Sequence, residues 1–286
     1  MKIVKYFIEF IFIVFLLIIF KVLGIKFASN FGSFIGGLIG PFFRSKKKIK
    51  LNIKKAFPEI NEKNTDIIAK KMWKNYGRIL SEYVFIKNFR NSPYGKFITL
   101  EGQEILNKIK TSNEPVVFIS GHFNNFELMA MQIEKSGINL AAIYRPLNNI
   151  FLNKIMEIIR KKYICQNQIK KGKKGTRKLL EFFKKNNSIA LMIDQRVSEG
   201  IKTEFFGQKA FTTTIPAQLV KKFGCKIVPV YIERIEVSSF KIKIDEPIDY
   251  AKNISIEEIT LDLNKWLEKK ILKNPNQWIW SHNRWK

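Results

Sequence analysis

The longest uninterrupted run of apolar residues lies at the N-terminus of the chain. Residues 10–20 (FIFIVFLLIIF) carry no polar side chain, and the charged residues Glu9 and Lys21 flank them. A bilayer-crossing helix needs about 20 apolar residues, a length available from Ile3 to Ile25 if both flanking side chains extend to the headgroups. A signal peptide is the competing reading, but no small-residue cleavage site follows, so we predict an uncleaved anchor.

A second apolar segment, residues 22–43, follows directly and is rich in glycine. It ends in a basic cluster that starts at Arg44, and Lys2 and Lys5 precede the first segment, so positive charge flanks the region at both ends. Cytoplasmic flanks of membrane segments carry an excess of Lys and Arg, which favours a re-entrant hairpin or an interfacial segment over one clean crossing. A buried helix of a soluble domain is the alternative, since short apolar runs occur in both.

Beyond the basic cluster, the apolar pattern alternates between strand and helix periods. Strand-type runs occupy residues 115–119, 138–144, 188–193, 226–231 and 240–244. Helical spacing is found over residues 53–86, 126–135, 148–161, 176–185, 216–223 and 256–272. Such alternation predicts an α/β fold with a central mixed, partly parallel sheet flanked by helices. We therefore divide the chain into an N-terminal membrane anchor, residues 1–45, and a second domain, residues 46–286.

The net charge, the hydrophobic content and the numbers of Cys and His limit the functions that the chain can have. The 286 residues include 51 Lys and Arg against 24 Asp and Glu, a net charge of +27, and 46% of the residues are hydrophobic. This hydrophobic content excludes a disordered basic tail, and the charge indicates a polyanionic partner, which can be nucleic acid, an anionic membrane face or an acidic protein. Two cysteines, Cys165 and Cys225, and two histidines do not suit a disulfide framework or a closed zinc site. We expect no metal.

Three polar residues come directly after predicted strands: His122, Arg145 and Asp194. Ligands in open α/β sheets bind beyond the carboxyl ends of the strands, so these side chains are expected to converge. A neutral imidazole is a general base near pH 7 when a carboxylate orients it. Glu127 follows His122 by five residues, and a chain reversal between them would bring it back beside the imidazole. The alternatives are a turn histidine and an acid at a helix N-terminus, favoured by the dipole.

The motifs that accompany this pair limit the chemistry. No G-x-S-x-G, G-x-x-x-x-G-K-[ST] or G-x-G-x-x-G sequence is present, and Ser120 lacks the context of a nucleophile elbow. The residues instead favour direct, base-assisted attack of a substrate hydroxyl on an activated acyl group. Arg145 or backbone N–H groups would stabilise the oxyanion or hold a phosphate.

Several blocks of the chain resemble one enzyme family. Residues 121–127 (GHFNNFE) are similar to the H-x4-[DE] block of the lysophospholipid acyltransferase superfamily, in the form found in bacterial lipid A late acyltransferases, the lauroyl and myristoyl transferases. Blocks that are similar to the same family follow in order at residues 143–146, 194–195, 205–217, 228–234 and 275–286. With the apolar N-terminus, the resemblance covers essentially the whole chain and implies a glycerolipid acyltransferase-like fold.

The resemblance implies a function and a set of residues. Members transfer a fatty acyl group from acyl carrier protein to a hydroxyl of a lipid A precursor at the cytoplasmic face of the bacterial inner membrane, so residues 46–286 would be the catalytic domain. It implies His122 as the base, Glu127 as its partner, no covalent intermediate and no cofactor. The residues expected to bind substrate are Asn125, Arg145, Asp194, Gln195, Arg196, Arg234, His282 and Arg284.

Some residues depart from the family pattern and leave alternatives open. Asn124 stands where the family often has Gly, and Phe126 stands where Trp is common, so the acyl chain and the acceptor glycolipid are not defined. Residues 170–178 (KKGKKGTRK) are either a solvated run or a docking surface for an acidic carrier and lipid phosphates. His282 and Arg284 either bind phosphate or tie down the C-terminus.

Two other functions compete with that of a lipid A acyltransferase. The first is a glycerophospholipid acyltransferase that makes phosphatidic acid, against which the Trp-rich C-terminus argues. The second is a non-enzymatic basic protein that binds nucleic acid or anionic lipid. No recognised nucleic-acid motif accompanies the charge, so the expected partners are an acyl carrier protein, a lipid A precursor or other glycolipid, and membrane lipids, without nucleic acid.

Overall fold

A seven-stranded mixed sheet forms the centre of the computed structural model, which describes residues 2–93 and 95–286. The strand order is β1-β9-β8-β2-β5-β3-β4. Strands β8, β2, β5, β3 and β4 are parallel, whereas β9 is antiparallel to β8 and β1 is parallel to β9. The strands are β1 Ile98–Glu101, β2 Val117–Ser120, β3 Leu140–Tyr144, β4 Asn167–Lys170, β5 Ser188–Met192, β8 Ile227–Glu236 and β9 Ser239–Ile244. The predicted fold class is confirmed.

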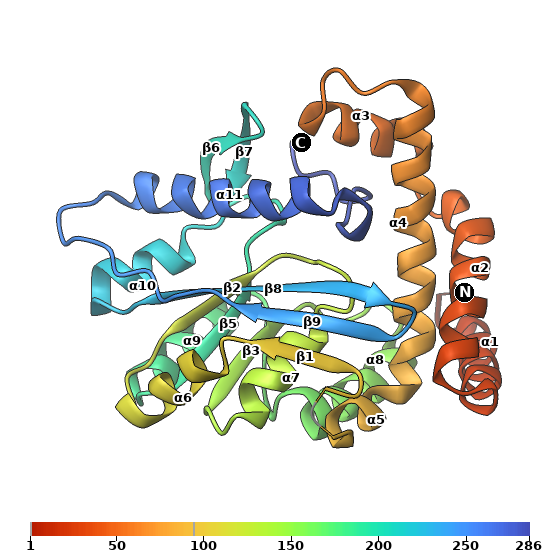
Figure 1. Cartoon of the computed structure of the whole chain (residues 1–286), viewed down its shortest axis with the longest axis horizontal. Helices are drawn as coiled ribbons and strands as arrows, with labels where there is room; N and C mark the ends of the chain where they lie inside the picture. Colours follow the sequence, from red (N-terminus) through yellow and green to blue (C-terminus); the bar gives the residue numbers. More distant parts are fainter. Residues whose placement is uncertain (1, 94) are drawn as a thin grey trace.

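Helices cover both faces of this sheet. They are α6 Gln103–Ser112, α7 Glu127–Lys135, α8 Ile150–Ile159, α9 Lys173–Lys184, α10 Ile215–Phe223 and α11 Ile256–Lys273, with a π-helical turn η3 at Arg160–Ile164 and a 3-10 turn η4 at Pro275–Gln277. In Figure 1, α11 lies above the sheet, whereas α6 and α7 lie below it. A capping box between Ser255 and Glu258 starts α11.

Four strands lie outside the runs predicted from the apolar pattern. Strands β1 and β4 have four residues each, and β4 (NQIK) is polar, so neither produces a strand signal. The other two form a separate antiparallel hairpin, β6 Ile201–Phe205 and β7 Gln208–Thr212. Phe206 and Gly207 turn this hairpin with positive φ angles of 52° and 68°. Such short or polar strands gain their stability from tertiary pairing.

The N-terminal helices form a group at one side of the sheet (Figure 1). They are α1 Lys2–Leu23, α2 Ile25–Ile39, the 3-10 turn η1 Gly40–Phe42, α3 Lys46–Ala56, α4 Glu62–Glu82, the 3-10 turn η2 Tyr83–Phe85 and α5 Ile86–Asn91. The single helix predicted over residues 53–86 is therefore wrong in detail, because Pro58 follows α3 and the Asn61 side chain caps a new helix. Within the described residues, α1 alone is long and apolar enough to cross a membrane.

Small residues let α2 pack directly on α4. A Cβ atom added to Gly77 would lie 1.9 Å from the carbonyl oxygen of Gly32, and one added to Gly36 would lie 2.4 Å from that of Trp73. The backbones therefore approach more closely than any larger residue would permit. Helix α4 in turn contacts η4, so it joins the N-terminal helices to the rest of the molecule.

Candidate active site

The first element of the site is the end of β2. Val117, Phe118 and Ile119 are buried in the core, and the chain leaves the sheet at Gly121, so His122 stands at the carboxyl end of a central strand. Ser120 is buried as well, and its hydroxyl donates a 2.6 Å hydrogen bond to the carbonyl of Val230. The hydroxyl is thus committed to a structural hydrogen bond.

His122 forms two hydrogen bonds with Asp194, which follows the neighbouring strand β5. Nδ1 of the imidazole lies 2.8 Å from Oδ1, and the backbone N–H of His122 donates to Oδ2 at 2.8 Å. The indole N–H of Trp278 donates to the same Oδ2 at 2.9 Å. Since an ionised carboxylate accepts only, Nδ1 carries the proton, and Nε2 is the nitrogen that can accept one.

The charge on Asp194 depends on these partners. The residue is fully buried, and burial alone would raise the pKa of its carboxyl. The charge of His122 and the hydrogen bonds from His122 and Trp278 outweigh burial and hold the pKa below its usual value. Asp194 is therefore an anion placed to stabilise a positive imidazole.

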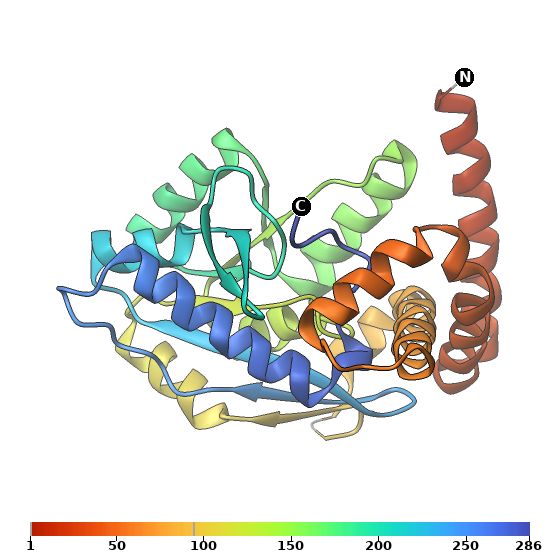
Figure 2. The same cartoon turned by 90° about the horizontal axis from the view of Figure 1, so that it is seen from above.

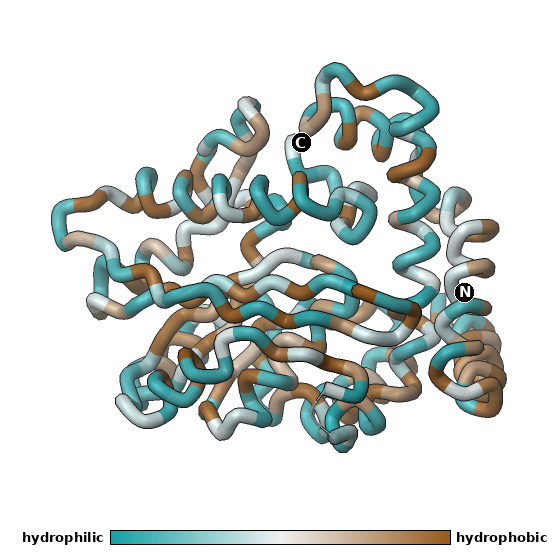
Figure 3. Tube along the Cα trace, viewed as in Figure 1, coloured by the Kyte–Doolittle hydropathy of each residue, from teal (hydrophilic) through white to brown (hydrophobic). Residues whose placement is uncertain are grey.

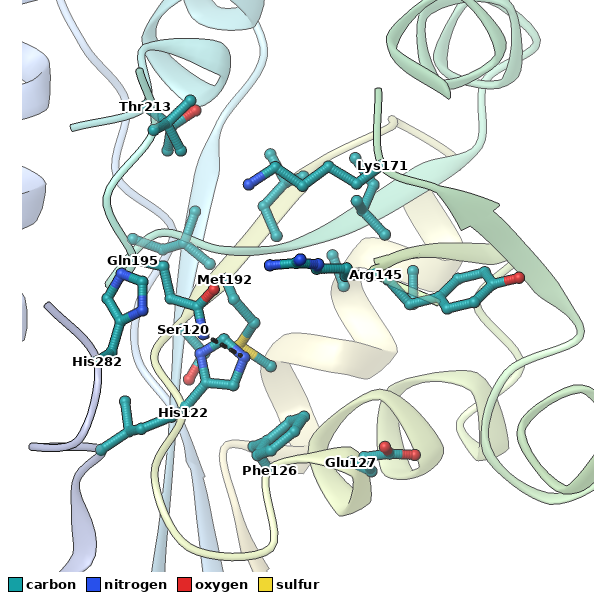
Figure 4. Close-up of a pocket in the computed structure, with 18 of the residues that line it drawn as sticks. Ser120, His122, Phe126, Glu127, Arg145, Lys171, Met192, Gln195, Thr213 and His282 are labelled. Carbon is teal, nitrogen blue, oxygen red and sulfur yellow. Dashed lines mark hydrogen bonds between the residues drawn. The ribbon is translucent and has the colours of Figure 1, made fainter. Parts of the chain in front are cut away.

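His122 lines a cavity of about 840 Å³ (Figure 4). The amide nitrogen of Gln195 lies 3.5 Å from Nε2. The cavity has an apolar interior supplied by the sheet and α7, at Phe118, Ile119, Met129, Ala130, Ile133, Ala142, Ile143, Ala190, Leu191, Met192 and Val230. Cationic side chains also line it, at Arg44, Lys48, Arg145, Arg160, Lys171, Arg196 and Lys286. It is suited to an amphiphile with an apolar chain and an anionic head.

Glu127 lies in the wall of the same cavity but contacts another partner. Its carboxylate accepts hydrogen bonds from Arg160, with Nη2 at 2.5 Å from Oε1, and from the hydroxyl of Tyr83 at 3.4 Å. Burial opposes the charge on Arg160, but the hydrogen bonds and charge of Glu127 raise the pKa of this guanidinium. The pair is a partly exposed cation and anion at the edge of the cavity.

The carboxylate that contacts His122 in the structure is that of Asp194, whereas Glu127, the partner expected from the sequence, pairs with Arg160. The ring of Phe126 packs edge-on against the imidazole, with centroids 4.7 Å apart, and Glu127 is the first residue of α7. In Figure 4 the Glu127 carboxylate lies on the far side of Phe126 from His122. The spacing of five residues brings both side chains to one cavity, whereas Asp194 makes the contact.

A polar network fixes the loop between His122 and Glu127. Asn124 has a positive φ of 46°, where Gly or Asn is favoured. Its backbone N–H donates to the carbonyl of Gln277 at 2.9 Å. The next residue, Asn125, donates from its side chain to Glu82 at 3.1 Å. The loop is thus held from the C-terminal segment on one side and from α4 on the other.

Glu82 connects this loop to the N-terminal helices. Its carboxylate is completely buried and accepts from Arg234, with Nη2 at 3.0 Å from Oε2. The hydroxyl of Ser29 in α2 also donates to it, at 2.8 Å. Four segments that are distant in the sequence therefore meet at one buried carboxylate, which fixes their relative positions.

The other predicted substrate-binding residues divide into two groups. Arg145, Gln195, Arg196 and His282 line the cavity. Asn125 and Arg234 are instead bonded to Glu82, and Arg284 is buried, where it donates to the carbonyl of Phe211 at 2.6 Å and to the hydroxyl of Thr212 at 2.7 Å. The contacts of Arg284 agree with its alternative reading, a tie for the C-terminus.

His282 faces the cavity as a neutral side chain. Its Nε2 accepts the backbone N–H of Arg196 at 3.0 Å, and burial lowers its pKa to about 4. It therefore holds the segment after Asp194 in place.

Sequence reasoning missed Arg160, Lys171 and Glu82. No spacing motif marks them, because each reaches the site from a separate element. Arg160 falls within the helix predicted over 148–161, and Lys171 falls within the basic run 170–178. Neither signal marks a residue of the site.

The sequence of the chain matches those of known proteins. The family model of the bacterial lipid A biosynthesis acyltransferases matches residues 1–286. The chain belongs to this family. It is 22% identical over 261 residues to the lipid A biosynthesis palmitoleoyltransferase of Escherichia coli (strain K12), covering 89% of this chain and 83% of that protein.

Two further relatives from the same organism agree. The lauroyltransferase is 23% identical over 262 residues, covering 89% of this chain and 84% of its own length. The myristoyltransferase is 19% identical over 243 residues, covering 82% and 73%. The protein is therefore an acyltransferase of the lipid A biosynthesis family, and these three relatives differ in the acyl group that their names specify.

Proposed function

We propose that this lipid A family acyltransferase moves a fatty acyl group from the thioester of an acyl carrier protein to a hydroxyl of a lipid A precursor. The observation that carries the proposal is the geometry of His122, whose Nδ1 is bonded to buried Asp194 while Nε2, 3.5 Å from the amide nitrogen of Gln195, lies on the cavity side. Family membership supports acyl transfer as the reaction and a lipid A-type molecule as the acceptor.

In the proposed reaction, Nε2 of His122 takes the proton of the acceptor hydroxyl while the hydroxyl oxygen attacks the thioester carbonyl carbon. The negative charge of the tetrahedral intermediate lies on the former carbonyl oxygen. The C–S bond then breaks, and the imidazolium returns the proton to the leaving thiolate. Asp194 stabilises the imidazolium between these steps through its 2.8 Å hydrogen bond. No acyl-enzyme is required, and the buried, bonded hydroxyl of Ser120 supports a direct transfer.

The charges around the cavity support the proposed substrates. Arg145 and Lys171 extend toward His122 in Figure 4 and are suited to the oxyanion or to a phosphate of the acceptor. The net charge of +27 favours association with an acidic carrier protein and with anionic lipid.

The proposal includes the location of the enzyme. Residues 1–45 would hold it on the cytoplasmic face of the bacterial inner membrane, and residues 46–286 would form the catalytic domain. The length and apolar character of α1 support membrane association.

The test is an assay of the purified full-length protein with acyl carrier protein thioesters and a lipid A precursor. We expect one added acyl chain by mass spectrometry, and a loss of roughly 10²–10⁴-fold in kcat for His122→Ala, as is usual for a general base. Lysophosphatidic acid and other glycolipids are offered as competing acceptors. Acylation of lysophosphatidic acid alone would replace the proposed acceptor, and unchanged activity in His122→Ala would overturn the mechanism.

Comparing lysine-neutralised variants with His122→Ala tests the non-enzymatic alternative. A basic binding protein would lose function when Lys170, Lys171 and Lys174 are neutralised and would keep it in His122→Ala, with a steep dependence on salt. The enzyme hypothesis predicts that His122→Ala has the larger effect. In the natural host, deletion of the gene should remove one acyl chain from the lipid A profile.

A further inference from the structure

Both ends of α1 are bonded to the same folded domain. Near its C-terminal end, Lys21 donates to the carbonyl of Val84 at 3.4 Å and to the side chain of Asn88 at 3.3 Å, and it stacks over the ring of Phe85. Phe20 is completely buried beside it. This end is fixed to η2 and α5.

The N-terminal half of α1 packs on α8. The side chain of Asn149, which caps α8, donates to the carbonyl of Tyr6 at 2.8 Å and to Glu9 at 3.3 Å. The ring of Phe151 lies 5.6 Å from that of Phe7. Figure 2 shows α1 along the side of the molecule over its full length, with its N-terminal half beside α8. The contacts at residues 6 and 21 are 15 residues apart, or about 22 Å along the helix.

The side of α1 that faces away from the domain is apolar and exposed. Ile8, Phe12, Phe15 and Val22 expose 63%, 64%, 61% and 82% of their surfaces. The same kind of surface continues on α2 and η1, at Phe27, Phe31, Phe34, Leu38 and Phe42. Figure 3 shows hydrophobic colouring along these outer helices. An exposed apolar surface of this extent is typical of a membrane contact.

Helix α8 belongs to this surface. It contains no buried residue, and Ile150 and Ile158 are 50% and 65% exposed although the helix is mainly apolar. The protein core therefore does not account for its composition. Exposed cations accompany it at Lys154, Lys161 and Lys162. Apolar side chains next to lysines are the pattern of a helix at a membrane interface with anionic headgroups.

These contacts decide between two orientations of α1. If α1 crossed the bilayer, the domain bonded at residues 6 and 21 would extend through the hydrocarbon beside it and reach both surfaces. Exposed charges such as Lys154 and Lys87 would then enter the membrane or lie across it, and a charged side chain inside a bilayer is strongly unfavourable. If α1 lies parallel to the surface, its exposed side enters the acyl boundary and the domain stays in water.

We propose that α1, although long enough to cross a bilayer, lies in the plane of one leaflet, and that α8 shares this membrane contact. The inference rests on the membrane association in the proposed function and adds its geometry. The helical turn η3 follows α8 directly, so Arg160 and the adjacent part of the cavity lie at headgroup level. Amphiphilic substrates then reach His122 without leaving the interface.

The test places single cysteines in the full-length protein and asks which side of the membrane they face. Lys2→Cys marks the start of α1, and Lys108→Cys marks exposed α6 at the opposite end of the molecule (Figure 1). The native Cys165 and Cys225 are buried, and the parent chain measures their background labelling. A membrane-impermeant maleimide is applied to inverted inner-membrane vesicles and to spheroplasts.

An in-plane α1 predicts that the two cysteines react in the same preparation, the inverted vesicles. Reaction of Lys2→Cys only in spheroplasts, with Lys108→Cys reacting only in inverted vesicles, would show a crossing helix and overturn the inference. Reaction of both only in spheroplasts would support the in-plane helix but overturn the proposed cytoplasmic face. Absence of the parent protein from the membrane fraction would overturn the membrane association itself, and with it this inference.

A second measurement tests α8. Ile158→Cys and Lys108→Cys carry an environment-sensitive fluorophore, and the labelled proteins are mixed with vesicles containing anionic phospholipid. We expect a blue shift, and quenching by spin-labelled acyl chains, for the label at 158 and no change for the label at 108. An unchanged label at 158 on vesicle-bound protein would remove α8 from the membrane surface.

Discussion

Nδ1 of His122 lies 2.8 Å from Oδ1 of Asp194, a residue 72 positions later in the chain. The carboxylate is fully buried and holds three hydrogen bonds, two from His122 and one from Trp278. An anion in such a site orients the imidazole and stabilises its protonated form, which is the state that a general base passes through. Glu127, at the H-x4-E spacing, instead pairs with Arg160 in the cavity wall.

The two carboxylates are therefore expected to differ in their effect on pH dependence. In Asp194→Asn the imidazolium loses its counter-charge, so protonation of the base becomes less favourable and the acidic limb of the kcat/KM profile should move to lower pH. We also expect kcat to fall roughly 10²–10⁴-fold. In Glu127→Gln activity should fall, because Arg160 is left unpaired, but the acidic limb should stay in place. The measurement is the pH profile of both variants.

The opposite pattern would contradict this assignment. If Glu127→Gln shifts the acidic limb and Asp194→Asn leaves it unchanged, the imidazole pairs with Glu127 during the reaction. Unchanged near-UV circular dichroism is the control that both variants retain the packing of Trp278 around the site.

The second prediction concerns the buried carboxylate of Glu82. Glu82→Gln leaves Arg234 without a counter-charge in the interior, and breaking a buried pair in this way costs about 3–5 kcal/mol. Ser29→Ala keeps the pair of Glu82 and Arg234 but removes the Ser29 hydroxyl, which bonds to Glu82, to the carbonyl of Val237 and to Arg78, and should cost about 1–3 kcal/mol. Urea unfolding measures both. Equal effects of the two substitutions would show that the Glu82 charge contributes nothing beyond a hydrogen bond.

The third prediction uses the neutral state of His282. Burial lowers its pKa to about 4 from a usual value of about 6.5, so the unfolded chain binds more protons than the folded one between these values. The free energy of unfolding should therefore rise with pH from 4 to 6.5, by at most about 1.4 kcal/mol per pH unit. Above pH 6.5 the contribution of His282 should be constant.

The variant His282→Gln isolates this contribution. Unfolding free energies of the parent and the variant are compared at several pH values from 4 to 8. The difference between them should change across pH 4–6.5 and be constant at higher pH. A difference that is independent of pH would show that His282 does not titrate with folding.

The fourth prediction tests the contact between α2 and α4. A Cβ at Gly32 would lie 2.4 Å from the carbonyl oxygen of Gly77, so Gly32→Ala forces the two backbones apart and should destabilise the protein by about 1–3 kcal/mol. Gly37→Ala in the same helix meets only the flexible side chain of Lys74, at 3.0 Å. Because Ala favours a helix over Gly by about 1 kcal/mol, this control should be neutral or stabilising. Thermal unfolding compares the two.

Much of the fold could be predicted from local pattern. The buried strands β2, β3 and β5 are continuous apolar runs, and α11 has both helical spacing and a capping box, so each carries its own signal. The polar strand β4 and the hairpin of β6 and β7 were missed, because their strand conformation depends on the strands beside them.

The candidate site also has a part that local sequence signals predicted and a part that depends on tertiary contacts. The strand ends indicated that His122, Arg145 and Asp194 would come near one another, and His122 and Arg145 do line one cavity. The spacing, an expected chain reversal and the family resemblance selected Glu127 as the partner of the imidazole. Phe126 and the start of α7 determine that Glu127 reaches Arg160 instead.

By itself, the sequence determined that the protein has an apolar N-terminal region, an α/β domain and a histidine after a central strand, because these depend on neighbouring residues. Only the tertiary structure decided that Asp194 holds the imidazole, that Glu82 joins the loop after His122 to α2, and that both ends of α1 are bonded to one domain. These contacts connect residues far apart along the chain, and a hydrogen bond requires its two atoms to come within about 3 Å. Only packing in three dimensions brings such residues to that distance.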